Sequence, residues 1–110
     1  MKRTLSLALA ALIAGTGSAA AQEKFTFALN WFAVGDHAAY WVALDKGYYK
    51  AEGLYVTMDP GQGSAGAVQR VATGAYQIGF ADVNSLIEYN AKNPGKEILC
   101  VFIAYDFPPF

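Results

Sequence analysis

Polar and ring-bearing side chains gather where an apolar run gives way to a helical pattern, and their chemistry suits ligand binding. Asn30 and Trp31 end the run, and Asp36, His37 and Tyr40 open the helix. Open α/β sheets bind ligands outside the carboxyl ends of their strands, where these residues would stand. Trp31 and Tyr40 could stack on a planar ring or pack on a chain. Asp36 could orient polar groups or cap the helix, and a neutral His37 could hydrogen-bond through either ring nitrogen.

A glycine-rich turn supplies a second candidate site. Glycines at positions 61, 63 and 66, with Asp82 about 20 residues further on, formally satisfy the dinucleotide fingerprint G-x-G-x-x-G. An acidic residue and a proline precede the turn in place of an apolar strand, which disfavours a dinucleotide-binding oxidoreductase. Two other interpretations stay open. Gly63 and Ser64 could contact a polar or anionic ligand group, or Ser64 could simply cap a helix after a plain turn.

Asp82 and Asn84 form the third candidate place, where another strand meets another helix. They would face the same rim as the first two places, although either residue could instead cap the helix. Ser85 and Glu88 have the spacing of a capping box. The chain has no Ser/His/Asp set, no cluster with metal-ligand spacing, and no second histidine to pair with His37. We therefore expect no catalytic residue, metal or cofactor, and a protein that is not an enzyme.

Alternating strand and helix signals would hold these three places at one end of a sheet. Apolar runs predict strands at residues 25–29, 54–59, 76–81 and 97–104, and 3.6-residue periodicity predicts helices at 38–46, 65–73 and 83–92. Trp41 and Leu44 share a helix face with His37 and Tyr40, and we expect those two to be core residues. Four strands separated by three helices favour an α/β fold with a parallel sheet and flanking helices.

The first residues indicate export. Lys2 and Arg3, an apolar run over residues 5–14 and three alanines at 19–21 predict a cleaved secretory signal over residues 1–21. The mature chain from residue 22 should be soluble and periplasmic, with no stable membrane insertion. No basic patch exists to neutralise phosphates, so no nucleic-acid partner is expected. Cys100 is the only cysteine, and its apolar surroundings predict a packed, inert thiol in a strand buried on both faces.

Three blocks of this sequence resemble the start of the SsuA/THI5-like (NMT1) solute-binding proteins of ABC importers. They are Leu29-Asn30-Trp31, DHAAYWVA at residues 36–43 and DKGYYKAEGL at residues 45–54, and the similarity continues through residues 61–64, 71–74 and 108–109. The resemblance implies a type 2 periplasmic-binding-protein fold. Complete members are several times longer, so residues 22–110 would be the amino-terminal part of the first lobe of a truncated protein.

The same resemblance implies a function and a site. A small polar or aromatic solute of the thiamine-pyrimidine, sulfonate, taurine or nitrate class would be captured in an interlobe cleft and passed to permease and ATPase subunits. The aromatic content favours a pyrimidine-like ligand. The cleft residues would come from all three places: Asn30, Trp31, Asp36, His37, Tyr40, Gly63, Ser64, Asp82 and Asn84.

An alternative from another functional class follows from the shared fold. Fungal and plant thiamine-pyrimidine synthases resemble the same proteins, and they are enzymes that sacrifice a histidine and draw on pyridoxal phosphate and iron. Their cysteine-rich signature is not found in this sequence. The predicted export signal also separates this chain from them, so solute capture is the favoured prediction.

Overall fold

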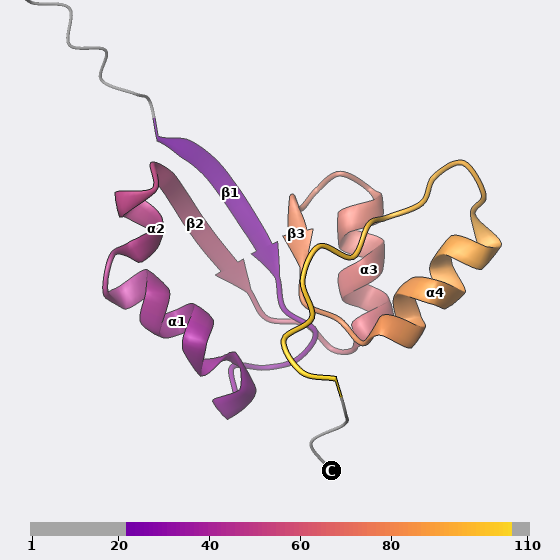
Figure 1. The fold of residues 1–110 in the computed structure, drawn as a ribbon, viewed down its shortest axis with the longest axis horizontal. Helices are drawn as coiled ribbons and strands as arrows, with labels where there is room; N and C mark the ends of the chain where they lie inside the picture. The colour runs from indigo at the N-terminus through magenta and orange to yellow at the C-terminus, as the bar shows by residue number, and fades with distance from the viewer. Residues whose placement is uncertain (1–21, 107–110) are drawn as a thin grey trace, which may run out of the picture.

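The structure, a computed structural model, describes residues 22–106, and its strands and helices lie within residues 23–92. The elements are β1 (Glu23–Ala28), η1 (Gly35–His37, a 3-10 turn), α1 (Ala38–Asp45), α2 (Tyr48–Ala51), β2 (Leu54–Asp59), α3 (Ser64–Ala72), β3 (Ile78–Gly79) and α4 (Val83–Lys92). In Figure 1, α1 and α2 lie on the β2 side of the sheet, and α3 and α4 lie on the β3 side.

The sheet has three parallel strands in the order β2-β1-β3. β1 pairs with β2 along its whole length, whereas β3 adds only two pairs, Phe27 with Ile78 and Ala28 with Gly79. Because the strands are parallel, their carboxyl ends meet at one end of the sheet. The loops that carry the three candidate places therefore start from neighbouring points.

A small apolar core lies between the sheet and the first helices. On β2, Val56 and Met58 are buried while Tyr55 and Thr57 are exposed, as the two-residue period of a strand requires. The buried cluster consists of Phe27, Leu29, Val56 and Met58, and partly buried side chains such as Tyr40, Trp41, Tyr49 and Phe80 pack against it. Trp41 is thus a core neighbour as predicted, but Leu44 is 36% exposed and does not belong to the core.

The predicted fold class is confirmed as α/β, with a parallel sheet and flanking helices compatible with a type 2 periplasmic-binding-protein fold. β2 and α4 have the predicted bounds, α1 ends one residue before its predicted range, and α3 is shifted by one residue at each end. The short helix α2 was not predicted. It begins directly after Gly47, whose left-handed φ of 73° ends α1 and turns the chain into a new helix.

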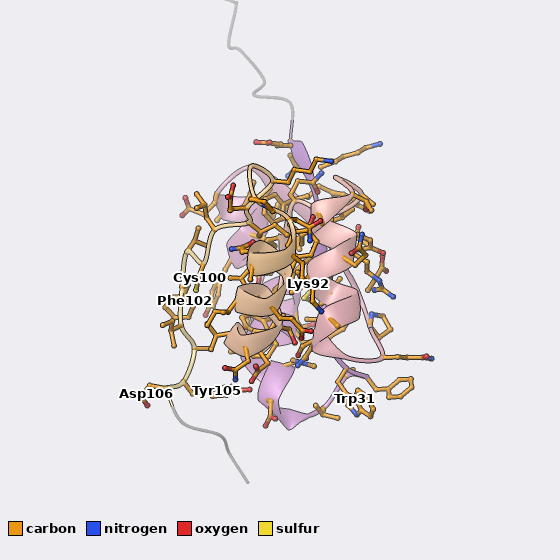
Figure 2. All side chains as sticks on the ribbon, turned by 90° about the vertical axis from the view of Figure 1, so that its right-hand side faces the viewer. Trp31, Lys92, Cys100, Phe102, Tyr105 and Asp106 are labelled. Carbon is orange, nitrogen blue, oxygen red and sulfur yellow. The ribbon has the colours of Figure 1, made fainter. Side chains whose placement is uncertain are left out.

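The strand predicted at residues 97–104 is wrong, because these residues form no strand and lie outside the sheet. β3 contains two residues, so it offers no long ladder to a further strand. The backbone of Ile98 is instead bound by the side chain of Asn90, whose Oδ1 accepts the Ile98 N–H at 3.0 Å and whose Nδ2 donates to the Ile98 carbonyl at 2.9 Å. Leu99 and Phe102 are 80% and 76% exposed, and Figure 2 shows Phe102 on this outlying segment.

Cys100 is exposed in the same segment, so the prediction of a packed, inert thiol is also wrong. Its Sγ lies 3.6 Å from the carbonyl oxygen of Phe102, and Figure 2 places it at the periphery. We expect a disulfide reagent to label Cys100 in the native protein at a rate close to that in the urea-unfolded chain, because exposure controls access to a thiol. Strong protection of the native thiol would contradict this exposure.

The signal predicted over residues 1–21 lies outside the described residues. Within residues 22–106, no helix has both the length and the apolar character needed to span a bilayer.

Candidate strand-end binding site

The loops that follow β1 and β2 are joined by their backbones. The Gly61 N–H donates to the Trp31 carbonyl at 3.2 Å, and the Gly63 N–H donates to the Asn30 carbonyl at 2.6 Å. Gly61 packs so closely that a Cβ atom there would stand 2.2 Å from the Leu29 oxygen. Gly63 has a φ of 130°, a conformation that strongly favours glycine. Close packing thus accounts for Gly61 and backbone conformation for Gly63, and neither glycine needs a dinucleotide to explain it.

A hydrogen-bonded chain of side chains connects the ends of all three strands. Ser64 Oγ accepts the backbone N–H of Asp82 at 2.9 Å and lies 3.4 Å from Asn30 Nδ2. The other half of the Asn30 amide, Oδ1, is 3.0 Å from His37 Nε2. Asn30 follows β1, Ser64 begins α3 after β2, and Asp82 follows β3. The structure therefore brings these four predicted residues together, and we call the group the strand-end site.

His37 is the buried member of the strand-end site, with 1% of its surface exposed. The Asn30 oxygen that faces Nε2 can only accept, so this hydrogen bond requires a proton on Nε2, and in a neutral ring Nδ1 is then an acceptor. Nδ1 is buried and has no hydrogen-bond partner within the described residues. An unpaired buried acceptor costs about 1–3 kcal/mol. A ligand that donates to Nδ1 would recover this free energy.

Aromatic rings line the strand-end site on one side. The Tyr40 ring lies 5.1 Å from Phe27 and 5.6 Å from Phe80, and the Phe80 ring lies 5.4 Å from the His37 imidazole, edge to face. Burial raises the pKa of the Tyr40 phenol, with smaller contributions from Tyr49 and Tyr105. Sequence reasoning missed Phe80. The other candidates were chosen because they follow a strand. Phe80 directly follows β3, so the same criterion could have found it.

Three predicted residues have exposed side chains that do not join the strand-end site. Trp31 is 49% exposed and stacks edge to face on Phe32 at 5.5 Å, and Figure 2 shows it standing away from the helices. Asp36 and Asn84 are exposed as well. Asp36 caps no helix, because η1 intervenes and His37 occupies the position before α1. Trp31 stays at the rim through its backbone bond to Gly61.

Of the helix caps considered for Ser64 and Asp82, the structure contains only the one at Asp82. Ser64 is the first residue of α3, the position before it is Gly63, and no side chain caps this helix. The Ser64 hydroxyl instead binds Asp82, so the interpretation of Ser64 as an N-cap is wrong. Asp82 does cap α4, accepting the Asn84 N–H at 2.8 Å. Glu88 pairs with Lys92 one helical turn later.

The side chains present show whether a metal ion or an aldehyde cofactor would fit the strand-end site. Within residues 22–106, no group of three or more His, Cys, Asp or Glu side chains is placed to hold a metal ion. The linked side chains of the strand-end site contain no lysine amine that could form an imine with an aldehyde cofactor. The linked side chains of the strand-end site thus do not fit iron or pyridoxal phosphate, and we derive no chemical step through either.

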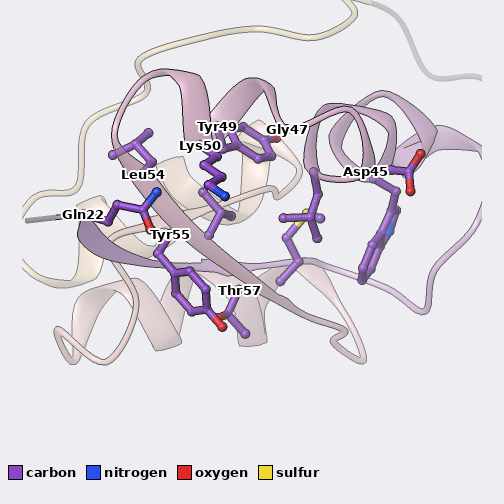
Figure 3. A pocket seen from close by; sticks show the side chains of 12 residues that line it. Gln22, Asp45, Gly47, Tyr49, Lys50, Leu54, Tyr55 and Thr57 are labelled. Atoms are coloured by element: carbon purple, nitrogen blue, oxygen red, sulfur yellow. The ribbon is translucent and has the colours of Figure 1, made fainter.

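Two surface hollows lie away from the strand-end site. A groove of about 660 Å³ is lined by residues of α1, α2 and β2, among them Tyr49, Lys50, Tyr55 and Thr57, as Figure 3 shows. A second hollow of about 270 Å³ lies between Phe32 and Arg70, beside the glycine-rich turn. None of the nine predicted site residues lines either hollow.

A second polar cluster stands beside the end of β2. The Tyr76 hydroxyl donates to Asp59 Oδ2 at 2.9 Å, and the Arg70 guanidinium lies 5.4 Å from the centre of the Tyr76 ring. Arg70 also donates to the Pro60 carbonyl at 2.9 Å. The hydrogen bond to Asp59 raises the pKa of Tyr76. Slight burial and the Asp59 charge add to this effect, and Arg70 opposes it.

This raised pKa predicts a pH-dependent contribution of Tyr76 to stability. A group that holds its proton more tightly in the folded state stabilises the fold below its unfolded pKa, about 10 for tyrosine, and that stabilisation is lost as the pH rises through the folded pKa. The difference in unfolding free energy between wild type and Tyr76→Phe should therefore shrink above about pH 10. Urea titrations across this range test it, with Tyr48→Phe as the control; a difference that does not change with pH would contradict it.

The fold and the strand-end site together define a class of protein, an α/β domain whose polar groups converge at the carboxyl ends of parallel strands. Residues 34–110, more than half of the chain, match the family described as NMT1/THI5 like. The chain belongs to this NMT1/THI5-like family. No solved structure matches it.

A curated relative carries an enzyme name. This chain is 31% identical over 71 residues to a 4-amino-5-hydroxymethyl-2-methylpyrimidine phosphate synthase from Aspergillus parasiticus, and the match covers 64% of this chain and 21% of the relative. The chain thus spans about a fifth of that protein. The prediction of a protein that is not an enzyme was wrong, because the named relative is a synthase. The prediction had rested on the lack of a Ser/His/Asp set, a metal-ligand cluster and a second histidine, and an enzyme can lack all three.

Proposed function

We propose that this chain forms part of the pyrimidine-binding site of an enzyme similar to 4-amino-5-hydroxymethyl-2-methylpyrimidine phosphate synthase. The observation that carries the proposal is the hydrogen bond between the buried His37 and the partly buried Asn30 at the carboxyl end of the sheet. The pair supplies hydrogen-bonding groups, and the aromatic rings beside it supply apolar contact. An aminopyrimidine needs both, since it is a flat ring with polar edges.

The arrangement assigns a part of the ligand to each group. Trp31 stands at the rim and is 49% exposed, so its indole is accessible for stacking on a pyrimidine face. His37 faces the edge of the ring that carries polar groups. Ser64 is the first residue of α3, so its backbone N–H lies at the positive end of a helix, the end that favours a phosphate, whereas the Gly63 N–H is already bound to the Asn30 carbonyl.

Calorimetric titration tests this proposal with two ligands, 4-amino-5-hydroxymethyl-2-methylpyrimidine and its phosphate ester, and with an alkanesulfonate and nitrate as alternatives. We expect both pyrimidines to bind, and the phosphate to bind at least as tightly. Trp31→Ala should weaken pyrimidine binding about fivefold or more, because stacking on an aromatic side chain contributes about 1–3 kcal/mol per base. Tyr48→Ala removes another exposed ring, on α2, and should leave the affinity unchanged.

Two results would contradict the proposal. One is the failure of both pyrimidines to bind, whether or not the sulfonate or nitrate binds. The other is an equal effect of Trp31→Ala and Tyr48→Ala, which would remove Trp31 from the site.

A second candidate function is capture of the same pyrimidine for an ABC importer in the periplasm. The pattern of residues 1–21 supports it, because a positive start, an apolar run and small residues before the cleavage point form an export signal. The partners would then be a permease and an ATPase. Mass spectrometry of the periplasmic fraction should find a chain beginning at Gln22. A chain that keeps residues 1–21 and stays in the cytoplasm would contradict this candidate.

A further inference from the structure

The environment of Asn30 determines which nitrogen of His37 carries the proton. Ser64 Oγ accepts the Asp82 N–H at 2.9 Å and is the partner of Asn30 Nδ2 at 3.4 Å. With its amino group directed to Ser64, the Asn30 amide turns Oδ1 toward His37 Nε2, 3.0 Å away. An amide oxygen can only accept, so Nε2 must be the protonated nitrogen. The unpartnered Nδ1 is then a lone-pair acceptor in a buried place.

We propose that Asn30 and Ser64 are positioning residues that hold His37 in the Nε2–H tautomer, and that Nδ1 accepts a hydrogen bond from an N–H group of the ligand. The ligand half of this inference rests on the proposed function, since the donor it names is the 4-amino group of the pyrimidine. A ligand with no N–H at that position would leave Nδ1 unpaired. A buried polar group without its partner is what allows a site to reject a close analogue.

The segment that precedes His37 can open to admit a ligand. His37 is the last residue of the η1 turn, Gly35–His37. Residues 31–36 lead into this turn and are all exposed. Backbone hydrogen bonds from Gly61 to Trp31 and from His37 to Val34 hold the segment, at 3.2 and 3.0 Å. A segment that buries so little surface opens at a small free-energy cost.

The tautomer can be measured directly because His37 is the only histidine in the chain. Long-range proton–nitrogen correlation spectra of protein labelled in the histidine ring should show a protonated Nε2 and a bare Nδ1 before any ligand is added. Ser64→Ala removes the acceptor for the Asn30 amino group and frees the amide to flip, so a mixture of tautomers should appear. Ser64→Thr keeps the hydroxyl and should keep the single tautomer.

Further variants separate this positioning role from a general loss of structure. Asn30→Ala should give the same mixture as Ser64→Ala. Gln69→Ala is the matched control, because Gln69 is an exposed polar residue on the same helix as Ser64. Its spectrum should equal that of the wild type. A protonated Nδ1 in the wild type, or a single Nε2–H tautomer in Ser64→Ala and Asn30→Ala, would overturn the positioning role.

Two matched probes test the ligand half. The 4-amino pyrimidine should bind about tenfold more tightly than its 4-dimethylamino analogue, which lacks N–H donors, because one hydrogen bond contributes about 1.4 kcal/mol. Binding of the 4-amino compound should also shift the Nδ1 resonance. Equal affinities with an unshifted Nδ1 would overturn the ligand half alone. Failure of both pyrimidines to bind would overturn the proposed function together with the ligand half, and the spectra without ligand would still decide the tautomer.

Discussion

Leu29→Ala should lower the free energy of unfolding by about 2–5 kcal/mol, the range measured for truncations of buried leucines that leave a cavity. The Leu29 side chain is fully buried, with no exposed surface, in the cluster with Phe27, Val56 and Met58. Its N–H donates to the Asp59 carbonyl at 2.9 Å, which fixes the chain where β1 and β2 end. A cavity here would therefore weaken both the core and the base of the strand-end site.

Leu99→Ala is the matched control for this substitution. Leu99 is 80% exposed in the segment that lies outside the sheet, so the same truncation should change the free energy of unfolding by less than about 0.5 kcal/mol. Urea denaturation of the two variants gives the comparison. Equal losses would show that residues 97–104 are packed as a buried strand after all.

The elements that the sequence predicted correctly are those with a strong local period. On β2, apolar and polar side chains alternate, and on α4 the apolar positions recur at helical spacing before Asn93-Pro94-Gly95. Both have the predicted bounds because the period of each is unbroken: β2 buries alternate residues, and on α4, which has no fully buried residue, Leu86 is partly buried. A strand also needs a neighbour, and no local period reveals one. The apolar run at 97–104 therefore predicted a strand that the two-residue β3 does not support.

The sequence predicted where in the fold the candidate site lies, but it did not predict which side chains contact one another there. Asn30, Ser64 and Asp82 were chosen because each follows a strand, and parallel strands do bring such positions together. The direction of each side chain depends on the turn that follows. The η1 turn exposes Asp36 while it buries His37, its immediate neighbour. The role of Ser64 as an acceptor for Asp82 required a contact across 18 residues, which no motif encodes.

Gly61→Ala should destabilise the protein by about 1–3 kcal/mol and weaken pyrimidine binding, because a Cβ would overlap the Leu29 carbonyl. That oxygen would be 2.2 Å away, and it belongs to backbone, so no side-chain rotation can relieve the contact. The loop must shift instead. It would then strain the bonds from Gly61 to Trp31 and from Gly63 to Asn30, which join the loops after β1 and β2. Both Asn30 and Trp31 would move relative to Ser64.

Gly66→Ala, in the first turn of α3, separates this steric effect from the general effect of replacing a glycine. A Cβ at Gly66 meets no atom within 4 Å, and its φ is not positive. Alanine there should stabilise the helix by about 0.5–1 kcal/mol, because it reduces the entropy of the unfolded chain. Urea denaturation and pyrimidine titration of both variants test the prediction. Since α3 also carries Ser64, normal binding by Gly66→Ala with weakened binding by Gly61→Ala would assign the defect to the joined loops. Equal behaviour of the two variants would contradict the close packing at Gly61.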